Sequence, residues 1–96
     1  MEIDSIRHKA LRRFFETGNA RGLVGDVGRL RKMLAFIVAA DGLDELRVPP
    51  NYGLHALVGD QQGRWAMTVT RNWRLTFGVN HQGALIEMDL EDYHGA

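Results

Sequence analysis

The sequence predicts a small α+β domain in which two N-terminal helices pack on one face of an antiparallel β-sheet. Two features of the sequence support this prediction, namely a change in the spacing of apolar residues and a break in the chain between the two halves. Apolar residues recur every three or four positions between residues 8 and 37, which is the period of a helix, and every second position after residue 64, which is the period of a strand. Pro49-Pro50-Asn51 breaks the chain between the two halves.

The first half is expected to form a helical hairpin that follows a short strand. Ile3 and Ile6 lie among polar residues and mark the expected strand at residues 3–6. The first helix is expected at residues 8–16, because Gly18 follows its last periodic position. The second helix is expected at residues 23–37, where apolar side chains spaced by four and three form one stripe.

The second half is expected to form the sheet. Strands are expected at residues 54–58, 65–70, 73–79 and 86–91. In the two central strands, the odd-numbered apolar residues are expected to face the helices, and Ile86, Met88 and Leu90 form the apolar side of the last strand. The other side of the central strands is then a bare polar face that carries Arg74 and Thr76. Such a face suits either plain solvation or a polar ligand.

Length, charge and composition narrow the class of protein. Ninety-six residues make one domain, residues 1–96. Twelve basic residues balance twelve acidic ones, so the net charge of the molecule gives no reason to expect binding to nucleic acid. The chain has no cysteine and no apolar run near the roughly 18 residues that span a membrane. Since its first residues also do not resemble a signal peptide, we predict a cytoplasmic protein without membrane contact.

Two side chains of the second half suit chemistry on a phosphate. His55 is a candidate general base, general acid or phosphate donor, and the alternative is a surface histidine on a strand. Arg74 offers a planar fork for phosphate oxygens, with Arg71 nearby, and the alternative is a cross-strand partner for Glu87 or Asp89.

The end of the chain is the third candidate. Asp92, Tyr93 and His94 place a carboxylate, a phenol and an imidazole at the end of the last predicted strand, and the alternative is a polar tail. Neither a metal nor a cofactor is predicted. The four histidines lack ligand spacing, and the glycines do not form a phosphate-binding loop.

Four segments, in order, resemble the HigB toxins of the RelE/ParE superfamily. They are residues 7–18 (RHKALRRFFETG), residues 54–60 (LHALVGD), the central hairpin from Trp65 through residues 72–77 (NWRLTF), and residues 91–94 (EDYH). In the second segment the family usually reads leucine-histidine-proline-leucine-lysine-glycine-aspartate. The matches cover nearly the whole chain.

The resemblance implies a RelE-like fold and the toxin of a type II toxin–antitoxin system. Such a toxin enters the ribosome and cuts messenger RNA in the decoding site without a metal. A HigA-like helix-turn-helix antitoxin would neutralise it, and operator DNA would be contacted only through that antitoxin. In this chemistry the ribose 2′-hydroxyl attacks the adjacent phosphate and the 5′-oxygen leaves, which requires a base, an acid and donors for the growing charge.

The resemblance also assigns roles to residues. His55 would be the base or a phosphate donor, and Arg74 a clamp for the transition state. Asp92 would transfer a proton or orient a neighbour, Tyr93 would stack on a base or position the ribose, and His94 would complete the group. Which group acts as base and which as acid stays open.

One departure from the family weakens the expected activity. Val58 stands where the family has lysine, and a lost cation at such a place costs roughly 3–4 kcal/mol unless another group compensates. Arg64, across the turn at residues 59–63, is the candidate replacement. Residues 48–96 also carry a net charge of −2, against +2 for residues 1–47. The alternatives are therefore a toxin homologue that only binds, as corepressor or ParE-like gyrase inhibitor, and an unrelated α+β interaction domain.

Overall fold

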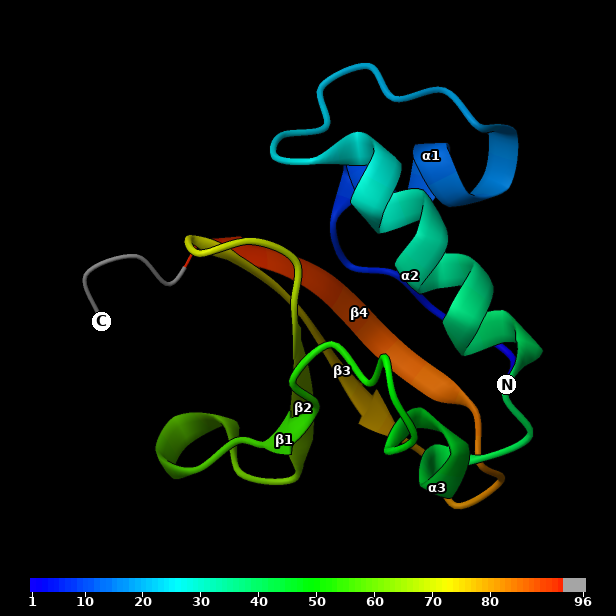
Figure 1. Cartoon of the computed structure of the whole chain (residues 1–96), viewed down its shortest axis with the longest axis vertical. Coiled ribbons are helices and arrows are strands. Elements are labelled where there is room, and N and C mark those ends of the chain that lie inside the picture. The colour runs from blue at the N-terminus through cyan, green and yellow to red at the C-terminus, as the bar shows by residue number, and fades with distance from the viewer. Residues whose placement is uncertain (93–96) are drawn as a thin grey trace.

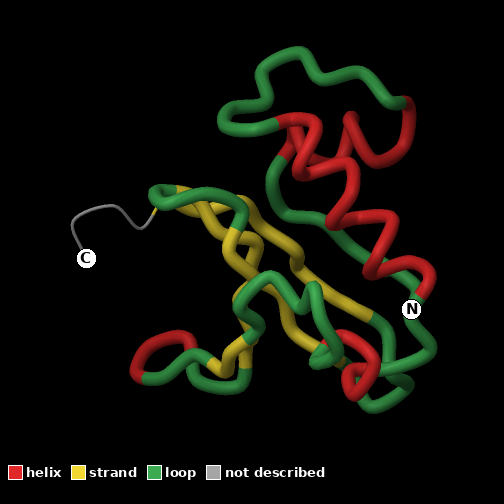
Figure 2. The backbone as a smooth tube through the Cα atoms, viewed as in Figure 1, coloured by secondary structure: helices red, strands yellow, loops and turns green. Residues whose placement is uncertain are grey.

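The chain folds into one layer of helices and one four-stranded antiparallel sheet, which confirms the predicted α+β class (Figure 1). The computed structural model describes residues 1–92. The elements are α1 (Lys9–Thr17), α2 (Val27–Ala39), α3 (Leu43–Leu46), β1 (His55–Ala56), the 3₁₀ turn η1 (Gly59–Gln61), β2 (Arg64–Thr68), β3 (Trp73–Val79) and β4 (Leu85–Asp92). The strand order β1-β2-β3-β4 is a meander, in which each strand pairs with the next (Figure 2).

Both long helices begin at a side chain that caps them. His8 Nδ1 accepts a hydrogen bond from the Leu11 amide (3.1 Å) at the start of α1. Asp26 Oδ1 accepts one from the Arg29 amide (3.0 Å) at the start of α2. The second helix therefore starts later than the predicted residue 23, and Leu23 packs against the core from the preceding loop. The cap was visible in the sequence as an aspartate before an apolar stripe.

The helices α1 and α2 lie on one face of the sheet and bury it (Figure 1). The buried cluster joins three sets of side chains, from α1 (Leu11, Phe14), from α2 (Leu30, Met33, Leu34, Ile37) and from the sheet (Met67, Leu75, Phe77, Leu85, Met88, Leu90). The predicted orientation of the odd-numbered residues in the central strands is thereby confirmed. No helix within residues 1–92 is long and apolar enough to cross a membrane.

A β-bulge in β4 changes which residues face the core. The pairing of β3 with β4 shifts between Thr76 and Gly78, and Glu87 adopts a positive φ of 49°. Ile86 consequently pairs with Gly78 on the face away from the helices, and Leu85 is fully buried instead. The prediction that Ile86 shares a face with Met88 is wrong, because a bulge inserts one residue and reverses the alternation on one side of it.

The N-terminal segment covers the edge of β4. Ile3 and Ile6 form isolated parallel bridges with Leu85 and Met88, rather than the continuous strand that was predicted. The Asp4 amide donates to the Leu85 carbonyl over 2.7 Å, so the polar backbone of this edge is partly satisfied. The other edge of the sheet is β1, which spans two residues where five were predicted.

Candidate functional site

The sheet face opposite α1 and α2, here called the open face, gathers polar side chains from all four strands. Its first row across the strands consists of His55, Ala66, Thr76 and Asp89. The neighbouring row consists of Thr68, Arg74 and Glu91. Two of the residues singled out in the sequence, His55 and Arg74, therefore lie on one face of the sheet.

His55 is exposed, and its ring has a defined orientation. Its Nδ1 lies 2.8 Å from the carbonyl oxygen of Gly53. A carbonyl oxygen only accepts hydrogen bonds, so this contact assigns the proton to Nδ1. The neutral ring then carries an unprotonated Nε2, which can accept a proton from a bound molecule.

Arg74 is bound to the acid directly opposite it. Its Nη2 lies 3.1 Å and its Nε 3.3 Å from Glu91 Oε1, and the two side chains are only 21% and 19% exposed. The sequence suggested Glu87 or Asp89 as cross-strand partners, but those carboxylates lie 3.5 and 3.9 Å from Arg7. Arg74 thus presents a guanidinium whose charge is already paired.

Glu91 is the centre of a hydrogen-bonded group of five side chains, here called the open-face network: Gln61, Arg64, Arg74, Thr76 and Glu91. Glu91 Oε1 accepts from Gln61 Nε2 (3.1 Å), and Oε2 accepts from Thr76 Oγ1 (3.0 Å). Burial alone would raise the pKa of Glu91. The hydrogen bonds from Gln61, Thr76 and Arg74, together with the charge of Arg74, outweigh burial and hold that pKa below its ordinary value.

The polar face is therefore not bare, contrary to the expectation from the sequence. Thr76 is fully buried, although its side chain lies on the sheet face away from the helices. The side chains of Arg64 and Glu91 bond to its hydroxyl from both sides. Sequence reasoning missed Gln61 and Glu91. The signal for Glu91 was the strand register, which sets it opposite Arg74 once β3 and β4 are aligned.

The C-terminal candidates are only partly within the structure. Asp92 is exposed at the end of β4, and its Cα pairs with that of Trp73. Because strand side chains alternate, Asp92 starts from the face opposite to Glu91. Tyr93 and His94 lie outside the described residues. Val58 is 85% exposed next to the turn at η1.

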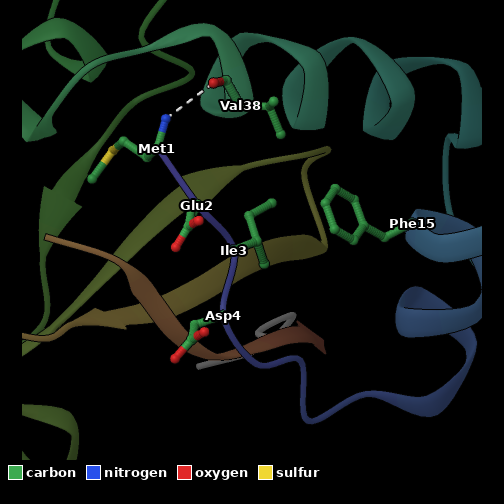
Figure 3. A pocket seen from close by; sticks show the side chains of 6 residues that line it. All are labelled: Met1, Glu2, Ile3, Asp4, Phe15 and Val38. Carbon is green, nitrogen blue, oxygen red and sulfur yellow. Dashed lines mark hydrogen bonds between the residues drawn. The ribbon is translucent and has the colours of Figure 1, made fainter. Parts of the chain in front are cut away.

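Among residues 1–92, a well-formed cavity lies apart from the open-face network. This cavity of about 530 Å³ lies between the N-terminal segment and the helices, and contains none of the open-face network (Figure 3). It is lined by Met1, Glu2, Ile3, Asp4, Phe15 and Val38. Within residues 1–92, no three histidine or acidic side chains are grouped closely enough to hold a metal ion. Small-molecule sites are usually concave, whereas a shallow polar face suits a macromolecular ligand.

Two comparisons assign the chain to a family. Residues 4–94 match the family described as the RelE-like toxin of the type II toxin-antitoxin system HigB. A curated relative, the Endoribonuclease HigB of Proteus vulgaris, is 41% identical over 93 residues, which cover 96% of this chain and 99% of the relative. The chain therefore belongs to the HigB family of RelE-like toxins, each of which is the toxin of a type II toxin–antitoxin system and has an antitoxin as its partner.

Proposed function

We propose that this toxin is an endoribonuclease of the cytoplasm that cleaves messenger RNA on the ribosome, and that a HigA-like helix-turn-helix antitoxin neutralises it. The relative from Proteus vulgaris is named as an endoribonuclease. The observation that carries the proposal is that His55, with Nε2 available to a ligand, shares one exposed sheet face with two arginines.

The proposed reaction needs no group from outside the chain for its proton transfers. His55 Nε2 takes the proton from the ribose 2′-hydroxyl, whose oxygen attacks the adjacent phosphorus. The bond from phosphorus to the 5′-oxygen breaks, and that oxygen receives a proton. We assign this proton to Tyr93 or His94 of the C-terminal group, in which Asp92 orients a neighbour and Tyr93 also positions the ribose. Arginine on the open face stabilises the charge that grows on the phosphate oxygens.

The test is cleavage of a defined message on translating ribosomes, with the RNA ends mapped at nucleotide resolution. The wild-type protein should produce new ends, and His55→Ala should lower the rate by about 100-fold, the usual contribution of a positioned base. His81→Ala is the matched control, because His81 is an exposed histidine in the turn between β3 and β4. Equal rates for wild type and His55→Ala would remove His55 from the mechanism.

A toxin homologue that binds without cutting is the alternative, and two observations favour it. Val58 supplies no cation, and the charge of Arg74 is paired with Glu91. In that case ribosomes would show no new RNA ends at micromolar protein, while the antitoxin complex would still form. A ParE-like gyrase inhibitor would instead cause DNA damage after induction.

A further inference from the structure

Arg64 reaches across the open face from β2 to β4. Its Nη2 donates to Thr76 Oγ1 on β3 (3.0 Å) and to the carbonyl oxygen of Glu87 on β4 (2.9 Å). The residue that pairs with Arg64 on β3 is Gly78, where a Cβ would already lie 3.2 Å from Ile86. Since Gly78 has no side chain, the long arginine side chain can cross the strand at this position.

The β4 bulge supplies one of the acceptors that fix Arg64. Glu87 has a positive φ of 49°, and its amide donates to Ser5 Oγ (2.7 Å) on the N-terminal segment. The bulge removes this peptide from regular pairing with β3, and its carbonyl oxygen faces Arg64 instead. A non-glycine residue held at positive φ is strained, and such residues are enriched at functional sites.

Arg64 differs from Arg74 in the charge of its partners. The acceptors of Arg64 are all neutral, namely the side-chain oxygen of Gln61, the hydroxyl of Thr76 and the carbonyl of Glu87. It forms no ion pair with any residue in the described part of the chain. Its hydrogen bonds within residues 1–92 come from Nε and Nη2, so Nη1 keeps its N–H donors for a ligand.

The strand pairing places Arg64 and His55 on the same sheet face, in adjacent rows. Arg64 pairs with Gly78, and the adjacent row of the same face contains His55, Ala66 and Thr76. Ala66 between them is small and fully buried, so no bulky side chain of β2 separates the two rows. An RNA backbone that crosses this face from β1 toward β4 would therefore pass from the ring of His55 to a guanidinium that Thr76 and Glu87 hold in a fixed direction.

We propose that Arg64 is the residue of the open face that contacts the scissile phosphodiester of the RNA, and that Thr76, Gln61 and the Glu87 carbonyl are positioning groups for it. The proposal rests on the proposed RNA cleavage for its substrate. A guanidinium fixed by neutral acceptors keeps its full charge for phosphate oxygens, and its fork binds two of them. Arg74, by contrast, has its charge already paired with Glu91.

The test is binding of a short single-stranded oligoribonucleotide whose riboses are 2′-O-methylated, so that no 2′-hydroxyl can attack. Affinity is measured by NMR titration at several salt concentrations for wild type, Arg64→Gln and Arg64→Lys. Arg12→Gln is the matched control, because it removes the same charge from an exposed position on α1, in the other layer. Thermal unfolding of each variant establishes that the folded protein is compared.

We expect Arg64→Gln to weaken binding about tenfold and to lower the slope of log affinity against log salt by about 0.7, the value for one phosphate contact on a single strand. Arg64→Lys should keep most of the salt slope and lose part of the affinity, because a lysine lacks the fork. Arg12→Gln should leave the affinity within about twofold. Equal affinities for wild type and Arg64→Gln, including no binding by either, would overturn the proposal and leave Arg64 as a structural crosslink.

The ribosome assay separates this inference from the function on which it rests. If wild type cleaves message and Arg64→Gln cleaves at least about tenfold more slowly at saturating ribosomes, both stand. If wild type does not cleave but its oligonucleotide affinity depends on Arg64, the nuclease function is wrong and the phosphate contact stands. If wild type cleaves and Arg64→Gln cleaves and binds as well as wild type, the function stands and the role of Arg64 is wrong.

Discussion

Arg74 on β3 and Glu91 on β4 are direct cross-strand partners, and Arg74 Nη2 lies 3.1 Å from Glu91 Oε1. Both side chains are about four-fifths buried, so this pair is shielded from solvent more than a surface salt bridge is. Glu91 also accepts hydrogen bonds from Gln61 and Thr76. One carboxylate thus connects β3, β4 and the turn η1, and its ionisation is coupled to the fold.

The first prediction concerns the pH dependence of stability. The pKa of Glu91 lies below its ordinary value of 4.5 in the folded chain. A carboxyl of this kind stabilises the fold above its unfolded pKa and loses that contribution as the pH falls through its folded pKa. The free energy of unfolding of the wild type should therefore decrease as the pH falls below about 4.5.

Glu91→Gln removes this ionisation and should show a shallower decrease over the same acid range. Urea unfolding between about pH 6 and pH 3 measures both curves, and other carboxyl groups contribute equally to each. Parallel curves for the two proteins would mean that Glu91 has the same pKa in the folded and unfolded chains.

The second prediction concerns the buried hydroxyl of Thr76. Thr76→Val keeps the shape of the side chain but leaves Arg64 Nη2 and Glu91 Oε2 each without one partner. We expect a loss of about 1–3 kcal/mol in the free energy of unfolding, because buried polar groups that lose their partner retain the cost of desolvation. Thr68→Val is the control on the same face, and its effect should stay within about 0.5 kcal/mol. A loss no larger for Thr76→Val than for Thr68→Val would show that the network is not stabilising.

The third prediction concerns the bulge in β4. Ser5 Oγ accepts the hydrogen bond of the Glu87 amide, so Ser5→Ala should destabilise the chain by about 0.5–1.5 kcal/mol. The same variant should raise hydrogen exchange at the Glu87 amide above that at the amides of the central strand β3. Ser5→Thr keeps the hydroxyl and is the control. Unchanged exchange at Glu87 in Ser5→Ala would contradict a supporting role for the serine.

Local periodicity explains why most of the fold was predictable. The buried stripe of α2 and the alternation of β3 come from side chains close together in sequence, and their burial follows from the period alone. The start of α2 was misplaced because Leu23 continues the apolar stripe through Gly25, whose φ of 89° is outside the helical region.

The open-face network could not be predicted from the periodicity of apolar residues, for a different reason. The alternation of Ile86, Met88 and Leu90 continues without interruption through the bulge, so nothing in it marks residue 87. The side chain that supports the bulge, Ser5, is 82 positions away in the sequence. Similarly, two of the three partners of Arg64 lie 12 and 23 positions away, so its role depends on strand register rather than on a motif.

The fourth prediction concerns the coupling between positions 58 and 64. The Leu57 amide donates to the Arg64 carbonyl (2.9 Å), so position 58 is one residue from direct pairing with Arg64, and Val58 is 85% exposed. If Arg64 supplies the cation that the family lysine supplies elsewhere, Val58→Lys should raise ribosomal cleavage less than about threefold in the wild type but at least about tenfold in Arg64→Gln. Four proteins, wild type, two single variants and the double variant, form the cycle. Equal gains in both backgrounds would mean that the two positions act independently, and no gain in either would mean that a cation at position 58 does not reach the phosphate.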